Sequence, residues 1–422
     1  MNTMVNYINN NKYLRNFFLL LAVIGPGIIT ANVDNDAGGI TTYSVAGASF
    51  GYKLLWVFIP MTLALIVVQE MSARMGAITR KGLADLIREN FGVRLTFCIM
   101  VGLIFADLGN TVSEFAGVAA SMEIFGVSKY LSVPVGAYMV WWTVVKGTFK
   151  VVERVFLVAS ALYFTYVASG ILANPPWGQV SMELITPHFE MDSAYLVMII
   201  GLIGTTIAPW MQFYIQSAVV EKGITAKEYK YSRMDVIFGC LMTDVIAIFI
   251  VVACAATLFA NNITIDTAKD AAIALEPLAG KWASMLFAFG LLNASIFSAS
   301  ILPLATAYYV CEAFGFEAGV NKTWGEAPVF YWLYTVLIII GAGIILIPDV
   351  PLITIMLWSQ VVNGILLPFV LIFMLQLIND EDLMGDYVNS RWYNLIAWST
   401  TIIMVSLTIA LVITSLFPDL MS

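Results

Sequence analysis

Long apolar stretches separated by short polar segments run along the whole of this 422-residue chain. A helix that crosses a membrane needs about 20 mostly apolar residues. Eleven stretches fit this length, and they predict an all-α integral membrane protein with 11 transmembrane helices. Their approximate ranges are 17–47, 54–76, 95–125, 131–147, 152–173, 194–221, 234–260, 282–315, 328–347, 351–378 and 393–417.

Two of these stretches are interrupted near their centres. The first contains VDNDAGG, with Asp34 and Asp36, and the sixth contains GTTIAPWMQ, with Pro209. A charge in the bilayer core costs at least about 2.5–3.5 kcal/mol, so acids placed there indicate cation binding. Two broken helices five spans apart predict two inverted five-helix repeats with a substrate site between them.

The same pattern sets the predicted domain boundaries. A cytoplasmic segment, two five-helix repeats, and an eleventh helix with the C-terminus are expected in that order. Their ranges are 1–16, 17–173, 194–378 and 392–422.

Composition supports a membrane location. Hydrophobic residues make up 60% of the chain and charged residues 11%, with a mean hydropathy of +0.87. Soluble domains are about 45–50% apolar and about 25% charged. The net charge of −8 leaves no basic surface for nucleic acid.

The basic residues predict the orientation. If the N-terminus is cytoplasmic, the outer segments hold only four of the 20 Lys and Arg residues, which are Lys53, Lys129, Lys269 and Lys281. Positive charge concentrates on the cytoplasmic side of membrane proteins. We therefore expect a multi-pass plasma-membrane protein with the N-terminus cytoplasmic and the C-terminus extracellular.

No constellation typical of an enzyme occurs in the sequence. The cysteines are isolated within predicted spans, which favours small buried residues over metal ligands. The single histidine, His188, lies in a predicted outer loop. No cofactor is expected beyond a transported ion, and the expected partners are that ion and the lipid bilayer, with no obligate protein partner.

Other polar residues lie at membrane depth. Asp107 and Glu114 are seven residues apart and share one face of the third span, where they fit a proton relay or an ion vestibule; satisfaction by neighbouring hydroxyls is the alternative. Gln360 and Asn363 fit a cavity face in the tenth span or hydrogen bonds between helices. Asp244 is a lone acid in the seventh span, with a structural or a functional role equally open.

Several motifs resemble the Nramp family of divalent metal transporters. They are GPG followed by Asp36 and AGASFGYKLLWV, VVQEMSARMGAITRKGLADLIRENFG, SEFAG, FKVVERVFLV, and LLPFVLIFMLQLINDEDLMGDYVNSRW. The resemblance covers nearly the whole chain. It implies a LeuT-like fold with broken helices 1 and 6, alternating access, and an ion held between the two breaks.

The chain departs from the family pattern at the implied site. The family's Asp-Pro-Gly-Asn reads Asp-Ala-Gly-Gly here, which keeps Asp36 and places Gly39 at the asparagine position. Where the family has Met-Pro-His, Ala208 replaces the methionine and Trp210 the histidine. Loss of a soft thioether removes a preference for transition metals, and two shortened side chains are expected to enlarge the site. The pattern resembles the magnesium-transporting branch of the family, which implies Mg²⁺ as a partly hydrated substrate, with Mn²⁺ tolerated.

The resemblance also implies the metal-binding residues. Asp36 is the expected carboxylate ligand, and Gly39 marks the vacated asparagine position. Asp34 has no acidic counterpart in the family motif and is a further candidate ligand of the same site. The backbone carbonyls expected to face the ion or its waters belong to Val33, Thr205 and Ala208.

Most groups of the family's proton path are missing here. Trp210 occupies the position of the family's histidine, and Thr111 occupies the position of an acid three residues before Glu114. The ninth span has no arginine. We therefore predict uncoupled transport, driven by the ion gradient and by a membrane potential worth about 2.3 kcal/mol per charge per 100 mV. The alternatives are a proton-coupled Mn²⁺/Fe²⁺ symporter and a cation-coupled carrier of amino acids or organic solutes with the same fold.

Overall fold

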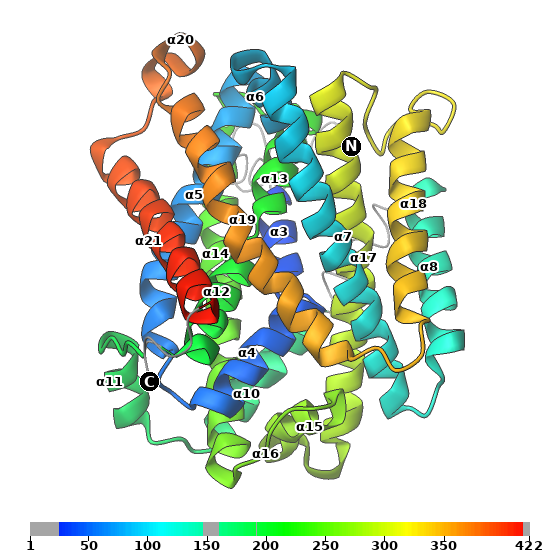
Figure 1. The fold of residues 1–422 in the computed structure, drawn as a ribbon, viewed down its shortest axis with the longest axis vertical. Coiled ribbons are helices and arrows are strands. Elements are labelled where there is room, and N and C mark those ends of the chain that lie inside the picture. Colours follow the sequence, from blue (N-terminus) through cyan, green and yellow to red (C-terminus); the bar gives the residue numbers. More distant parts are fainter. Residues whose placement is uncertain (1–24, 147–159, 191, 417–422) are drawn as a thin grey trace, which may run out of the picture.

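The computed structural model describes residues 25–146, 160–190 and 192–416, and within these ranges the chain is helical, with no strand (Figure 1). The α-helices are α3 (Pro26–Asp34), α4 (Ala37–Phe50), α5 (Phe58–Thr79), α6 (Leu83–Phe91), α7 (Val93–Ile124), α8 (Lys129–Val145), α10 (Phe164–Leu172), α11 (Trp177–Ile185), α12 (Ser193–Thr206), α13 (Pro209–Glu221), α14 (Tyr229–Thr257), α15 (Ala268–Ala272), α16 (Glu276–Ala279), α17 (Ala283–Phe314), α18 (Pro328–Ile345), α19 (Leu352–Ile378), α20 (Glu381–Met384) and α21 (Arg391–Leu416). The predicted segment 1–16 lies outside the described residues.

Eight predicted spans coincide with helical segments long and apolar enough to cross a membrane. These are Leu55–Thr79, Val93–Ile124, Ser193–Glu221, Tyr229–Asn261, Ala268–Phe314, Pro328–Ile345, Leu352–Ile378 and Arg391–Thr414. Of the other three, the first is divided into α3 and α4, and the fourth is α8, which has 17 residues. The fifth is described only from residue 160 onward. The total of 11 spans therefore stays a prediction.

The start of α3 is held by an acid from a distant helix. α3 begins with Pro26 directly after Gly25, a placement that suits proline because the first helical N–H has no helical partner. The Asp235 carboxylate of α14 accepts hydrogen bonds from the backbone N–H groups of Gly25, at 3.3 Å, and Gly27, at 2.7 Å. These bonds satisfy free amides at the helix N-terminus and attach α3 to α14.

Glycines bring α14 against both halves of the first broken helix. A Cβ atom on Gly27 of α3 would lie 2.7 Å from the Val236 backbone, and one on Gly47 of α4 would lie 2.5 Å from the Val251 carbonyl oxygen. Small residues allow such close backbone approach between membrane helices. α14 therefore packs along α3 and α4 together.

Both predicted interruptions are confirmed as helix breaks, and the structure places them together. α3 and α4 lie inside the bundle, with α21 along one side and α8 and α18 along the other (Figure 1). The Tyr43 hydroxyl of α4 and the Thr206 hydroxyl of α12 are 2.8 Å apart. The inverted relation between the repeats and the domain boundaries stay predictions.

Candidate functional site

Asp36 lies at the first helix break and is 5% exposed. It is the N-cap residue of α4, and its carboxylate accepts a hydrogen bond from the Gly39 N–H at 2.5 Å. It also interacts electrostatically with the carboxyl group of Glu114 from α7. Two buried carboxyl groups in contact need a proton or a cation between them. The structure thus brings together two acids that the sequence separates by 78 positions.

The first break also frees backbone carbonyls. In a continuous helix the Val33 carbonyl would accept from the Ala37 N–H, but that N–H donates to the Glu114 carboxylate at 3.3 Å. The Asn35 carbonyl likewise loses the Gly39 N–H to the Asp36 side chain. The Val33 carbonyl, implied as a ligand by the sequence, is therefore without its helical donor.

The second break frees a carbonyl in a different way. Pro209 begins α13 and has no N–H, so the Thr205 carbonyl four residues earlier has no helical donor. The buried Thr205 hydroxyl also has no hydrogen-bond partner in the described structure. The Ala208 carbonyl is already engaged, since it accepts from the Met211 N–H at 3.2 Å. Thr205 thus offers two oxygens at this break, its backbone carbonyl and its hydroxyl.

Gly39 lies where the two breaks meet. A Cβ atom at this position would be 2.5 Å from the Asp34 carbonyl oxygen, 3.1 Å from the Thr205 hydroxyl and 3.3 Å from the Asp36 carboxylate. The Asp34 carbonyl therefore lies where the first side-chain atom of a larger residue would be, and an enlarged ion site stays a prediction.

Gln360 reaches the first break from α19. A Cβ atom on Gly38 would lie 1.9 Å from the Gln360 amide nitrogen, so that amide covers the glycine. The Asn363 side-chain amide donates to the side-chain oxygens of Gln360, at 3.0 Å, and Asn110, at 2.9 Å. Asn110 in turn donates to Asp107 at 3.2 Å. Hydrogen-bonded side chains therefore connect the break to Asp107.

Asp107 and Glu114 have different surroundings although both lie on α7. The Asp107 carboxylate accepts from the hydroxyls of Thr306 and Tyr309, each at 3.0 Å, as in the alternative of a satisfied buried acid. Glu114 keeps one buried carboxylate oxygen without a partner in the described structure. Glu114 therefore belongs to the break, and Asp107 to a network between α7, α17 and α19.

Asp34 interacts electrostatically with Asp36, but its hydrogen bond goes to a different helix from the one that carries Glu114. Its carboxylate accepts from the Thr243 hydroxyl of α14 at 3.3 Å and interacts electrostatically with Asp244 of the same helix. The sequence shows Asp244 only as a lone acid, and no local signal connects residues 210 positions apart.

An apolar cluster closes off one side of the breaks. Trp210 is buried in it, with Tyr214 as an aromatic neighbour at 6.1 Å between ring centroids. The cluster joins α3, α13 and α17 and consists of Ile29, Val33, Ala208, Trp210, Met211, Tyr214, Phe297, Ile301, Leu302 and Ala305. The cluster packs these three helices against one another beside the breaks.

The side chains at the breaks offer few atoms that could bind a metal ion, and these atoms are oxygens. In residues 25–146, 160–190 and 192–416, no three His, Cys, Asp or Glu side chains gather at one point. The cysteines are free: Cys240, Cys254 and Cys311 are buried as expected, whereas Cys98 is exposed, contrary to the prediction. An ion at the breaks would therefore complete its coordination with water, as Mg²⁺ commonly does.

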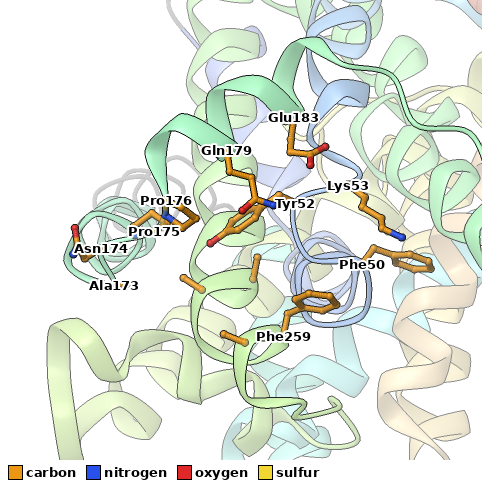
Figure 2. A pocket seen from close by; sticks show the side chains of 13 residues that line it. Phe50, Tyr52, Lys53, Ala173, Asn174, Pro175, Pro176, Gln179, Glu183 and Phe259 are labelled. Atoms are coloured by element: carbon orange, nitrogen blue, oxygen red, sulfur yellow. The ribbon is translucent and has the colours of Figure 1, made fainter.

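A larger pocket of about 400 Å³ lies away from the breaks, where α4 ends beside α11 and the end of α14. Figure 2 shows Tyr52, Gln179 and Glu183 around it. Lys53 is paired with Glu190 at 2.7 Å, and the Glu183 carboxylate lies 2.5 Å from a ring nitrogen of His188. This pocket is not a candidate ion site.

Comparisons with known sequences find one family of proteins. A sequence model of the Nramp family, described as natural resistance-associated macrophage protein-like, matches residues 27–414. The chain is 26% identical over 402 residues to a divalent metal cation transporter MntH of Deinococcus radiodurans, covering 92% of this chain and 88% of the relative. It is 28% identical to an MntH of Klebsiella pneumoniae, covering 94% and 95%.

Solved structures share the fold. The Eremococcus coleocola manganese transporter, in complex with an aromatic bis-isothiourea substituted compound, has a TM-score of 0.75 at 23% identity, covering 94% of this chain and 86% of that one. A nucleobase–cation symporter in a closed conformation has a TM-score of 0.58 at 17% identity, covering 94% of each chain. The fold is therefore that of membrane transporters.

Proposed function

Because the chain belongs to the Nramp family, we propose that it is a secondary transporter of divalent metal ions that works by alternating access. Like the transporters it resembles, it is not an enzyme. The observation that carries the proposal is the buried Asp36 carboxylate between two helix breaks. It lies beside the Thr205 hydroxyl and next to backbone carbonyls without helical donors. Separation of the apolar cluster around Trp210 would open this site to one side of the membrane.

Mn²⁺ is the first candidate substrate. The relatives are named as divalent metal cation transporters, and the structural neighbour as a manganese transporter. These names favour the manganese alternative over the magnesium interpretation of the sequence.

Mg²⁺ is a second candidate, supported by the donors at the breaks. The side chains of Asp36, Glu114 and Thr205 offer only oxygen. The nearby thioether of Met211 accepts a hydrogen bond from the Gln69 amide at 3.2 Å. A site of carboxylates, carbonyls and water suits hard cations, and Mg²⁺ keeps several waters when bound.

An uptake assay in proteoliposomes tests both candidates. We expect Mn²⁺ uptake, and we expect Mg²⁺ to inhibit it at concentrations no more than about tenfold above that of Mn²⁺. The reason is that a site with only oxygen ligands gives little advantage to the softer ion. Ca²⁺ serves as the larger competing ion. Mn²⁺ uptake unchanged by a large excess of Mg²⁺ would exclude magnesium, and absence of any divalent uptake would refute the transport function.

We also propose that transport is not coupled to protons. In support, Trp210 lies in an apolar cluster, and the Asp107 carboxylate is satisfied by hydroxyls. The close approach of the buried acids Asp36 and Glu114 favours the coupled alternative, because metal binding there would displace a proton shared by the two carboxyl groups. The comparisons give the uncoupled proposal no support.

A pH-sensitive dye inside the liposomes decides between these possibilities. Metal uptake at constant internal pH is the expected result, with a protonophore leaving the initial uptake rate unchanged when the potential is clamped. Acidification in proportion to the metal taken up would establish the proton-coupled alternative instead.

The basic residues and the acid at the first break bear on the location of the protein and on transport of an organic solute. We propose a plasma-membrane location with a cytoplasmic N-terminus and an extracellular C-terminus, on the distribution of basic residues. An organic solute with a carboxylate would be repelled by the buried carboxylate of Asp36, which disfavours the amino-acid carrier.

A further inference from the structure

A second group of buried oxygens lies on the other side of the first break. Asp34 at the end of α3 and Asp244 on α14 are each 2% exposed and interact electrostatically. Thr243 connects them, since it precedes Asp244 in the chain and its hydroxyl donates to Asp34 at 3.3 Å. Asn35 donates to the same Thr243 hydroxyl at 2.8 Å. Four polar residues from two helices thus form one cluster.

Most oxygens of this cluster have no partner. Both carboxylate oxygens of Asp244, one of Asp34, and the side-chain carbonyl oxygen of Asn35 are buried without a hydrogen bond in the part of the chain that the structure describes. The Thr62 hydroxyl interacts with the Asp244 carboxylate, but it donates its proton to the Phe58 carbonyl at 2.7 Å. Within the same described residues, no Lys or Arg forms an ion pair with either carboxylate.

Charge and donor type together indicate the ligand. Buried carboxylates without partners are stabilised either by protons or by a positive ligand, and several free oxygens gathered around two carboxylates favour the positive ligand. Two carboxylates are balanced by a charge of two. All the atoms of the cluster that are free to bind a metal ion are hard oxygens, which suit Mg²⁺ or Mn²⁺.

Space for water adjoins the cluster. A small cavity of about 10 Å³ is lined by Asn32, Asn35 and Thr243, together with apolar residues of α3 and α14. That volume is about enough for one water molecule. A bound ion could therefore keep part of its hydration.

We infer that Asp34, Asp244, Asn35 and Thr243 form a second site for a hard divalent cation, on the opposite side of the first break from Asp36. The break makes this possible, because the chain leaves the helical path between α3 and α4. Asp34 then faces α14, while Asp36, two residues later, faces α7. The inference goes beyond the proposed transport site and does not depend on Asp36 binding the ion.

The test is the number of Mn²⁺ ions bound by the purified full-length protein, measured by electron paramagnetic resonance of free Mn²⁺ during titration into the millimolar range. We expect two ions per wild-type chain. Asp244→Asn, which keeps the side-chain shape and removes the charge, is expected to bind one. Asp36→Asn is also expected to bind one, because each variant loses a different site.

Asp235→Asn is the matched control. Asp235 lies on α14 as well, but it is occupied by the amides of Gly25 and Gly27, so its replacement is expected to leave two ions bound. If Asp244→Asn does not fold, Thr243→Val provides a second variant, with an expected loss of about tenfold or more in affinity at one site.

The outcomes separate the two proposals. One ion per wild-type chain that is lost in Asp36→Asn overturns this inference and leaves the transport site standing. One ion that is lost only in Asp244→Asn supports this inference and overturns the Asp36 site. Two ions that both survive Asp244→Asn, or no bound ion at any concentration, overturn it as well.

Discussion

Replacing Asp36 with alanine is expected to abolish divalent metal uptake, with a loss of at least about 100-fold. Asp36 supplies a buried carboxylate at the meeting point of the two breaks, in contact with Glu114 and close to Thr205. Mutation of residues that only support metal ligands already lowers metal affinity or activity by about 10–100-fold. Mutation of a direct ligand should therefore lower it further. The measurement is the initial rate of Mn²⁺ and Mg²⁺ uptake into proteoliposomes.

Asp36 has a structural role that must be separated from ion binding. Its carboxylate caps α4 by accepting from the Gly39 N–H, and loss of such a cap costs about 1 kcal/mol. Asp36→Asn keeps a capping oxygen and removes the charge. We therefore expect both variants to lose uptake but only Asp36→Ala to lose thermal stability. Asp382→Ala, at an exposed acid of α20, is the control. Near-normal uptake by Asp36→Asn would refute the assignment of this site.

Gly204→Ala is expected to have the second largest effect, through the packing of α12 against α19. The added Cβ atom would lie 2.1 Å from the Gln360 carbonyl oxygen and 2.4 Å from the Gly364 nitrogen. Both are backbone atoms, so the two helices must move apart. Overpacking costs about 1–3 kcal/mol, and the shift also moves Gln360 away from the first break. We expect a clearly lower melting temperature and a loss of most uptake.

Gly201→Ala is the matched control for this prediction. It lies one turn earlier on α12, and its Cβ atom would meet side-chain atoms of Val361 and Thr42 at 3.4 and 3.6 Å, which are ordinary contacts. It is expected to keep both stability and uptake. Equal melting temperatures for the two variants would show that α12 and α19 are not held by this close approach.

Much of the fold was readable from the linear sequence. Apolar stretches of sufficient length located eight helical segments that can cross a membrane. Gly, Pro and acidic residues located both helix breaks, because these residues disrupt a helix through local backbone chemistry. Local signals could not locate the glycine contacts of α14, since a glycine that allows close approach looks like any other in the sequence.

The candidate site, like the fold, was only partly predictable from the sequence. Asp36 at the break, and the loss of helical donors at Val33 and Thr205, follow from residues adjacent in the chain. The position of the Asp34 carbonyl beside Gly39 does not.

The sequence by itself determined that this chain crosses a membrane repeatedly and that two of its helices break around an acid and a proline. Hydrophobic length and backbone chemistry are local properties, so no neighbouring helix is needed to read them. Only the tertiary structure decided that Asp36 meets Glu114, that Asp34 meets Asp244, and that Gln360 covers Gly38. These contacts depend on how each helix is rotated against its neighbours, and that rotation is set by the packing of the whole bundle.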